Sequence, residues 1–393
     1  MRADTALLHS RSVVDLKDPL DTHGEDMLER AIRIESLGAW DVPLVICTAD
    51  QVLGLVQNNR RALFSFPSIG NGAFVFDEIH QYDSRLFGAL LRFLEAFRGA
   101  PILLMTASLP ESRLRALQKV LDQGGKTLEI VAGPPDLENI PRYELQGLSN
   151  DPPWDLVQQT LLEGGKVLWV ANTVDRAVNF AKEARIRGLQ SVLPYHSRYR
   201  YSDRVEKHAA IVNAFKDNSP GPVLAVTTQV CEVSLDLSAH LLVSDLAPVP
   251  ALIQRMGRLN RRVTPDSPGR TGPAIFLEPG NSLPYEREDL EIAQQWLQSL
   301  GNSPLSQAAL ASTFEKIAQD EAVASVESAW LDGGPFSKPA PLREAGVTIA
   351  VICAEDESAC VDERGYPISR EITRHTIPMT LGPVAKEISN QWC

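Results

Sequence analysis

The sequence predicts an α/β protein with two successive lobes, each built on a parallel sheet. Strand and helix patterns alternate along the chain, which is typical of parallel strands joined by helices. The alternation stops between residues 133 and 153, where Pro, Gly, Asn and Asp accumulate, and then restarts. Polar residues follow the strands of both repeats, at the edge where open α/β sheets bind their ligands.

Because 393 residues exceed one ordinary core, we expect several domains. Residues 1–135 are expected to form a first lobe and residues 154–280 a second lobe, joined by a linker over 136–153. Residues 281–393 carry a weaker pattern and are expected to form a small C-terminal accessory domain.

Each element is predicted from its apolar pattern, since amphipathic helices repeat apolar residues every three or four positions and buried strands are short apolar runs. In the first lobe we expect helices over 27–37, from 52, over 86–97 and over 111–121, and strands over 44–47, 74–76 and 101–105. In the second lobe we expect strands over 167–171, 191–195, 223–227 and 241–244, and helices over 175–187, 203–216 and from 250. Farther on we expect helices over 290–300 and 305–323 and a strand over 347–353.

The composition restricts the class of protein. With 44% hydrophobic and 22% charged residues the chain has the make-up of a soluble globular protein. Its formal net charge of −12 gives no overall attraction for nucleic acid, so such binding requires a local basic groove. The five cysteines form no Cys-x-x-Cys pair, which argues against a zinc site and fits a reducing cytoplasm. No apolar run reaches the roughly 18 residues of a membrane span, so no membrane partner is expected.

Residues 74–80 form the first motif with chemical meaning, an apolar run followed by two carboxylates and a histidine. A buried strand over 74–76 delivers Asp77 and Glu78 to the ligand-binding edge of the sheet. Paired carboxylates there suit a magnesium nucleotide, because one can hold the metal and the other can polarise an attacking water. The alternative is a strand that ends in a solvated turn.

The second motif is an arginine cluster. The spacing of Arg255, Arg258 and Arg261 places three guanidiniums along one helical face. Arginine suits phosphate because its planar fork keeps its charge and forms two parallel hydrogen bonds. The alternative is a solvated basic helix, which would not require the interleaved Gln254 and Gly257.

The order and spacing of these motifs resemble those of superfamily 2 helicases. The matching stretches are Asp77-Glu78-Ile79-His80, Thr106-Ala107-Ser108 and Gln254 to Arg261. A narrower resemblance, to the CRISPR-associated helicase–nuclease of type I systems, rests on Asp77 to Asp83, Thr228 to Asp236 and Ala247-Pro248-Val249. The resemblance covers about residues 44–262 and implies tandem RecA-like lobes with parallel sheets, the first of them truncated at its N-terminal side.

The resemblance also implies a site for ATP and Mg²⁺ in the first lobe. Asp77 would hold the magnesium ion and Glu78 would orient the hydrolytic water. His80 would couple this site to the second lobe through a hydrogen bond toward Gln254.

Further implied roles concern the γ-phosphate, the ribose and the nucleic acid. Arg258 and Arg261 would reach the γ-phosphate, and Asp236 would contact the ribose. Thr106 and Ser108 would link hydrolysis to strand movement, although the family more often has the order Ser-Ala-Thr. The residues expected to contact nucleic-acid phosphates are Thr48, Gln51, Asn172, Thr173, His196, Thr228 and Gln229.

The sequence departs from this family in two respects. No glycine-rich loop ending in Gly-Lys-Thr precedes Asp77, although the family uses such a loop to cradle phosphates. The stretches over 124–127 and 164–166 lack the required strand before them and are expected to be turns. None of the seven histidines is followed by Asp, so no metal-dependent HD nuclease is expected. We therefore expect the chain to begin inside the first lobe and to cut no DNA.

The function implied by the resemblance is that of an ATP-dependent translocase or helicase on single-stranded DNA in type I CRISPR interference, an antiviral defence. Expected partners are single-stranded DNA, a guide-RNA surveillance complex of the Cascade type, a separate HD nuclease and the missing first-lobe segment. The chain is expected to be cytoplasmic and, as a fragment, not to hydrolyse ATP alone. Two alternatives remain open: an RNA-directed superfamily 2 helicase, and a non-catalytic remnant or split half that binds nucleic acid or a partner.

Overall fold

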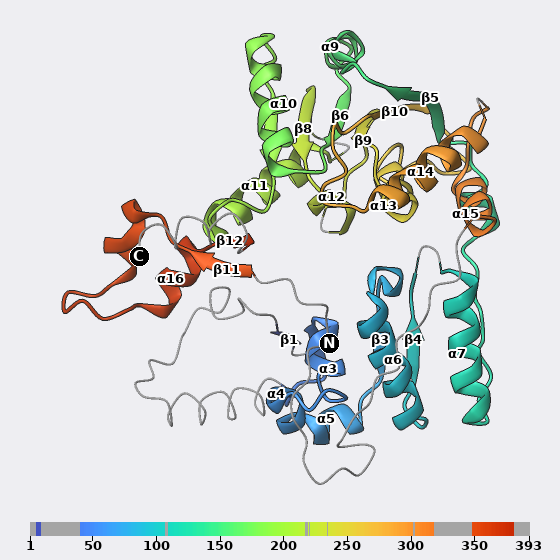
Figure 1. Cartoon of the computed structure of the whole chain (residues 1–393), viewed down its shortest axis with the longest axis vertical. Helices are drawn as coiled ribbons and strands as arrows, with labels where there is room; N and C mark the ends of the chain where they lie inside the picture. The colour runs from blue at the N-terminus through green and yellow to red at the C-terminus, as the bar shows by residue number, and fades with distance from the viewer. Residues whose placement is uncertain are drawn as a thin grey trace. The chain divides into compact units, whose positions relative to one another are not determined.

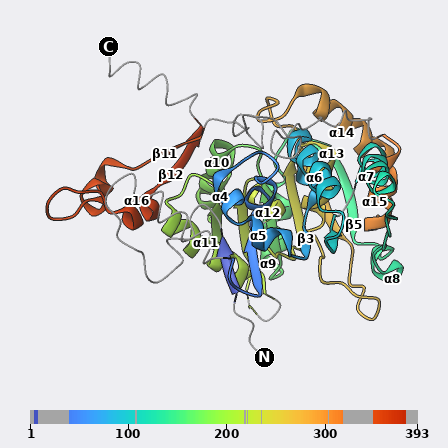
Figure 2. The same cartoon turned by 90° about the horizontal axis from the view of Figure 1, so that it is seen from below.

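The computed structural model describes residues 5–8, 40–106, 109–216, 219, 221–233, 235–301, 303–317 and 348–380. These residues form two compact units, one mainly from the N-terminal part up to residue 130 and one mainly from residue 131 onward. Figures 1 and 2 show their helices and strands. The expected helix over 27–37 lies outside the described residues.

The second unit is built on a six-stranded parallel sheet in the order β5-β10-β9-β6-β8-β7. Its strands are short apolar runs: β5 (Tyr143–Ser149), β6 (Lys166–Val170), β7 (Val192–Tyr195), β8 (Val223–Thr227), β9 (Leu241–Asp245) and β10 (Gly272–Leu277). In the centre of the sheet Leu168 of β6 is aligned with Ala225 of β8 and with Leu242 of β9. The α/β class and the parallel sheet are confirmed.

Side chains alternate between the two faces of this sheet, and helices cover both. Trp169 of β6 belongs to the core formed with α9 (Trp154–Leu162) and α10 (Val174–Ile186). Leu168 belongs to the other core, formed with α11 (Tyr201–Ala214), α13 (Val249–Met256), α14 (Arg287–Ser299) and α15 (Gln307–Glu315). All five residues of β6 are buried, as expected for a parallel strand covered on both faces.

Three expectations about the second lobe were wrong. The segment expected to be a linker contains α8 (Pro135–Glu138) and the edge strand β5, which pairs with β10. The helices α14 and α15 share a core with the sheet and are not part of a separate accessory domain. Helix α13 ends at Met256, so the three arginines do not share a helical face. The first two corrections share one cause, because contacts distant in the sequence place β5 in the sheet and α14 and α15 in its core.

The first unit contains two parallel strand pairs. β1 (Thr5–Leu8) pairs with β2 (Leu44–Cys47), and β3 (Phe74–Phe76) pairs with β4 (Ile102–Leu104). The helices are α3 (Ala49–Leu53), α4 (Arg60–Phe64), α5 (Phe66–Gly70), α6 (Ser84–Ala96) and α7 (Glu111–Gln123). Asp83 caps α6 by accepting a hydrogen bond from the Leu86 amide at 2.8 Å.

One face of β3 and β4 packs on α6, and the other is open among the described residues. Phe76 lies against Phe93 with ring centroids 5.7 Å apart on the packed face. On the opposite face Val75 is 63% exposed and Leu103 is 54% exposed. Successive strand side chains point to opposite faces, so β3 has one face covered by α6 and one exposed face. The residues that follow β3 lie at the edge of this strand pair.

The C-terminal residues include the antiparallel pair β11 (Thr348–Val351) and β12 (Ile377–Thr380), the 3-10 helix η2 (Ala354–Cys360) and α16 (Ser369–His375). Arg200, at the start of α11, donates to Asp356 of η2 at 2.6 Å and also to Glu355. These ion pairs fix η2 to the second unit. No helix among the described residues is long and apolar enough to cross a membrane.

We predict that Leu242→Ala will destabilise the second unit, because Leu242 is fully buried in the central strand β9. The free energy of unfolding in urea should fall by about 2–5 kcal/mol. Leu162→Ala is the matched control, since Leu162 on α9 is 82% exposed and should change this free energy by less than about 0.5 kcal/mol. Equal effects of the two variants would contradict the described packing.

Candidate functional site

The first cluster of polar residues lies at the carboxyl end of β3. Met105 after β4 donates its amide to the Phe76 carbonyl at 2.8 Å, and its own carbonyl accepts from the Ile79 amide at 3.2 Å. These bonds hold the residues after β3 beside those after β4. The strands therefore bring Asp77, Glu78 and Thr106 to one edge, as expected from the sequence.

His80 joins this cluster through its ring. His80 Nδ1 lies 3.3 Å from Glu78 Oε2 and 3.2 Å from Thr106 Oγ1. Burial lowers the pKa of His80, the nearby Arg113 lowers it further, and Asp77 partly offsets both. A neutral imidazole is therefore favoured at pH 7, with one ring nitrogen that donates and one that accepts. His80 thereby connects Glu78 with Thr106, the residue expected to link ATP hydrolysis to movement of the nucleic-acid strand.

Glu78 has an uncommon backbone conformation. Its φ angle is +53°, in the left-handed region that few residues other than glycine adopt. Its amide donates to Asp77 Oδ1 at 2.9 Å. Such backbone conformations cost energy and concentrate at functional sites, where neighbouring contacts hold them.

The residues present fit a magnesium nucleotide. Magnesium is usually held by one or two carboxylates together with phosphate oxygens and water, and the side chain of Asp77 is an exposed carboxylate at the sheet edge. Asp77 would hold the ion, and the metal would supply charge to neutralise phosphate oxygens. Ser108, expected to act with Thr106, lies outside the described residues.

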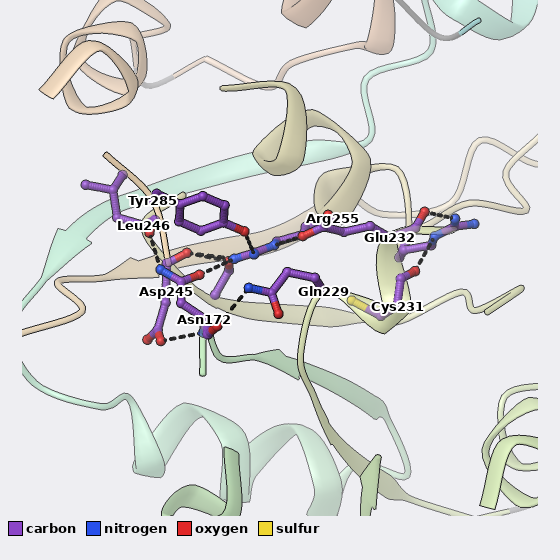
Figure 3. A network of polar contacts seen from close by, with 10 residues as sticks. Asn172, Gln229, Cys231, Glu232, Asp245, Leu246, Arg255 and Tyr285 are labelled. Carbon is purple, nitrogen blue, oxygen red and sulfur yellow. Dashed lines mark hydrogen bonds and ion pairs between the residues drawn. The ribbon is translucent and has the colours of Figure 1, made fainter. Parts of the chain in front are cut away.

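The second cluster surrounds the guanidinium of Arg255, whose side chain is fully buried (Figure 3). Nε donates to Glu232 Oε1 at 2.8 Å, and Nη2 donates to the Tyr285 hydroxyl at 3.2 Å. Nη1 donates to Asn172 Oδ1, Ser244 Oγ and the Asp245 carbonyl at 3.0–3.1 Å. Arg255 thus links the residues that follow β6 and β8 to the end of β9.

Asn172 and Asp245 extend this network to α10. The Asn172 amide donates to Asp245 Oδ2 at 2.9 Å, and its side chain donates to the Leu246 carbonyl at 2.7 Å. Arg176 of α10 binds both oxygens of Asp245, at 2.8 and 2.7 Å. Because every charge in the network has a partner of opposite sign, its burial is tolerated.

The two other arginines, Arg258 and Arg261, lie in different environments. Arg258 is 7% exposed and donates to the carbonyls of Cys231, at 3.1 Å, and of Glu232. Its guanidinium holds the short helix α12 (Val230–Val233) in place, and its phosphate role stays a prediction. Arg261 has a side chain that is 44% exposed and pairs with Asp236 at 3.2 Å, so the residues expected at the γ-phosphate and the ribose contact each other.

The residues expected to contact nucleic acid fall into two groups. Asn172 and Thr228 are buried, and the side-chain amide of Asn172 binds within the lobe, so the structure gives Asn172 an internal role. Thr173 caps α10 by accepting from the Arg176 amide at 3.3 Å, and Gln229 donates to the Asn172 carbonyl at 2.7 Å.

The remaining members of this set are placed differently. Thr48 is exposed and Gln51 is half-buried, both at the start of α3. His196 is 6% exposed and stacks on Tyr199 with ring centroids 4.2 Å apart. Gln254, which is expected at the nucleotide site and not at the nucleic acid, is half-buried on α13. The binding roles of these residues stay predictions.

Sequence reasoning missed several members of the second cluster. Asp245 follows an apolar run just as Asp77 does, and this similarity was a usable signal. Glu232 lies inside the stretch from Thr228 to Asp236 that carries the resemblance. Tyr285 lies in a segment without a motif, and no pattern in the sequence indicated it.

Comparison with known proteins places these clusters in context. Residues 163–264 match the family model described as CRISPR-associated nuclease/helicase Cas3, C-terminal. A putative CRISPR-associated nuclease/helicase Cas3 of Myxococcus xanthus is 46% identical over 352 residues, which are 89% of this chain and 46% of that protein. The chain thus spans about half the length of the curated relatives it matches.

Two solved structures show the same fold. A crystal structure of T. fusca Cas3 with ADP matches with a TM-score of 0.72 at 20% identity, covering 97% of this chain and 55% of that one. A chain from a CRISPR RNA-guided surveillance complex before nicking matches with a TM-score of 0.64 at 19% identity, covering 97% of this chain and 58% of that one. The fold is that of tandem RecA-like lobes.

We predict that His196 makes stability fall with acidification. Burial lowers the pKa of His196 to about 4, and Arg198 and Lys207 add to this shift. An unfolded histidine has a pKa near ~6.5, so between about pH 6.5 and pH 4 the unfolded chain binds the proton more strongly. The free energy of unfolding should therefore decrease as the pH falls through this window, by at most about 3 kcal/mol from this residue.

The test is the unfolding free energy of wild type and His196→Gln from pH 7.5 to 4. The difference between the two curves isolates His196 from His80 and His240, whose pKa values burial also lowers. The variant should lose less stability on acidification than the wild type. Parallel curves would contradict the burial of a neutral His196.

Proposed function

Because this chain is related to the CRISPR-associated nuclease/helicase Cas3 proteins, we propose that it forms the ATP-driven motor part of a type I CRISPR interference enzyme that moves along single-stranded DNA. The observation that carries this proposal is the cluster at the end of β3. There the two adjacent carboxylates, the histidine and the threonine meet as a nucleotide-hydrolysing site requires.

In this proposal each residue of the first cluster has one task. Asp77 holds Mg²⁺ beside the phosphates of ATP. Glu78 orients the attacking water, and the contact of its carboxylate with His80 at 3.3 Å fixes its direction. Thr106 couples ATP hydrolysis to strand movement, and it is linked to the site by its 3.2 Å contact with the His80 ring. Relatives solved with ADP, ATP and AMPPNP support nucleotide binding.

The second lobe supplies an arginine that contacts the phosphate of ATP and the residues that contact nucleic acid. Arg261 is the proposed phosphate ligand, because its side chain is exposed and its partner Asp236 is itself exposed. Arg258 is assigned to holding α12, since backbone carbonyls occupy its guanidinium. Thr173 and Gln229, at the ends of β6 and β8, are proposed to contact the phosphates of single-stranded DNA.

The partners follow from the same relationship. A related chain occurs in a CRISPR RNA-guided surveillance complex, which supports a Cascade-type complex as the partner that opens the DNA. An HD nuclease supplied elsewhere is proposed to cut the strand. Residues 1–76 contain no Gly-Lys-Thr loop, so hydrolysis is proposed to depend on a segment that carries one.

The ATPase rate tests this function. The chain is measured with oligo(dT), with oligo(U) and without nucleic acid, alone and together with a first-lobe segment of a relative that carries the Gly-Lys-Thr loop. We expect hydrolysis only with that segment, stimulated more by DNA than by RNA. Glu78→Gln should lower the rate about 100-fold or more and leave nucleotide affinity within about threefold, because only the water-orienting group is lost.

Glu111→Gln serves as the matched control, because Glu111 is an exposed carboxylate on α7 and should leave the rate unchanged. Full activity of Glu78→Gln would sink the assignment of the catalytic carboxylate. Stronger stimulation by RNA would favour the RNA-directed helicase. Nucleic-acid binding without hydrolysis in any mixture would favour the non-catalytic alternative.

A further inference from the structure

We propose that Arg200 binds a phosphate of single-stranded DNA and that the acidic segment η2 occupies this arginine until DNA displaces it. The inference rests on the proposed function of the second lobe, to which it adds an autoinhibitory contact. Arg200 lies between β7 and α11, and Asp356 of η2 lies 156 residues farther along the chain. Both residues belong to the second unit.

The guanidinium of Arg200 is paired with carboxylates in the way in which arginine pairs with phosphate. Its Nε donates to Asp356 Oδ2 at 2.6 Å, and its Nη2 donates to Glu355. Its Nη1 lies 3.8 Å from Asp203 Oδ2. Carboxylate and phosphate oxygens both fit the planar fork of arginine, so the two acidic side chains of η2 use the donors that a phosphate would use.

The chain around Arg200 combines cations with aromatic rings. Residues 196–207 contain four arginine or lysine residues and two acidic ones, in a protein whose formal net charge is −12. Lys207 Nζ lies 4.7 Å from the centroid of the Tyr199 ring, and the guanidinium carbon of Arg204 lies 5.7 Å from that of the Tyr201 ring. Such surfaces suit single-stranded nucleic acid, because cations hold phosphates and rings stack on bases.

His196 gives a second, independent indication of a ligand at this surface. Its side chain is 6% exposed and stacks on Tyr199, and its Nδ1 has no hydrogen-bond partner among the described residues. Buried polar atoms are normally satisfied, so a water or an ion is expected beside this nitrogen. Arg198 and Lys207 act on the same ring by lowering its pKa, and a protonated Nδ1 among cations favours an anion.

The segment η2 is held at α11 by polar contacts. Among the described residues, none from 348 to 380 belongs to the three apolar cores. The side chain of Arg200 is 28% exposed and that of Glu355 is 72% exposed. Ion pairs at exposed positions contribute little net stability and are weakened by salt, so a polyanion can compete for Arg200.

The charge of the covering segment matches that of the proposed ligand. Residues 354–363 contain five acidic residues and no lysine or arginine. Single-stranded DNA also presents closely spaced negative charges, one on each phosphate. DNA can therefore replace these carboxylates at Arg200 without leaving the guanidinium unpaired.

Neutralising the acidic partners tests this inference. The full chain is titrated into a fluorescent 20-nucleotide oligo(dT) as wild type, as the neutralised pair Glu355→Gln with Asp356→Asn, as Arg200→Gln, and as the triple variant. We expect the neutralised pair to bind about five- to tenfold tighter than the wild type, because Arg200 is no longer occupied by carboxylates. The triple variant should bind no tighter than Arg200→Gln alone, and its salt slope should be smaller than that of the neutralised pair by about one.

Glu357→Gln with Glu363→Gln is the matched control. It removes two charges from the same acidic stretch, both residues are exposed, and Arg200 pairs with neither of them. The affinity of this control should stay within about twofold of the wild type, because salt screens charges that make no direct contact. Wild-type affinity in the neutralised pair, an equal gain in the control, or a gain that persists in the triple variant would overturn the proposal.

Hydrogen exchange measures the displacement itself and separates this inference from the proposed function. Saturating oligo(dT) should speed amide exchange severalfold in wild-type peptides over 354–360 and leave those over 166–170 unchanged. If the chain binds oligo(dT) and exchange over 354–360 does not change, the inference fails while the nucleic-acid function stands. If neither the wild type nor the neutralised pair binds oligo(dT), the nucleic-acid function is wrong and the inference fails with it.

Discussion

The second lobe depends on one interaction, the burial of the Arg255 guanidinium among the residues at the strand ends. Removing a cation from water costs several kcal/mol, so it is tolerated only when its donors are matched by well-placed acceptors. Glu232 supplies the opposite charge, and Asn172, Ser244, Asp245 and Tyr285 supply further oxygens. Burial raises the pKa of Glu232, and the field of Arg255 offsets part of that shift.

This constraint connects segments with different proposed tasks. Arg255 follows Gln254 directly and lies six residues before Arg261. Its acceptors Asn172 and Glu232 lie just before α10 and in α12, and its other acceptors lie at the end of β9 and just before α14. Arg258 adds a second link by holding the carbonyls of α12. Hydrogen bonds thus connect Arg255 to Asn172, which directly precedes Thr173 and accepts from Gln229.

Sequence reasoning reached the elements and the first cluster because both depend on local patterns. The run over 74–76 is a strand that pairs with β4, although its central residue Val75 is exposed and not buried as expected. The pairing brings Asp77 and Glu78 beside Thr106 as expected. The strand β8 has the expected bounds, Val223–Thr227. These outcomes follow from apolar period and from the geometry of parallel strands.

Contacts between segments that are distant in the sequence could not be predicted from local patterns. β5 was read as a linker because its Asn, Asp and Gly neighbours indicate turns, and only its pairing with β10 makes it a strand. Arg258 was read as a phosphate ligand because its type and spacing suit phosphate, but the carbonyls that hold it belong to a segment 26 residues away. Tyr285, which belongs to no motif, reaches Arg255 across 30 residues of sequence.

The most direct test of this account is a double-mutant cycle on Arg255 and Glu232. The free energy of unfolding in urea is measured for Arg255→Met, Glu232→Leu and the double variant, followed by intrinsic tryptophan fluorescence. Each single variant should lose about 3–5 kcal/mol, since it leaves a buried charge without its partner, and the double variant should lose much less than the sum. Additive losses would contradict the claim that this buried ion pair organises the second lobe.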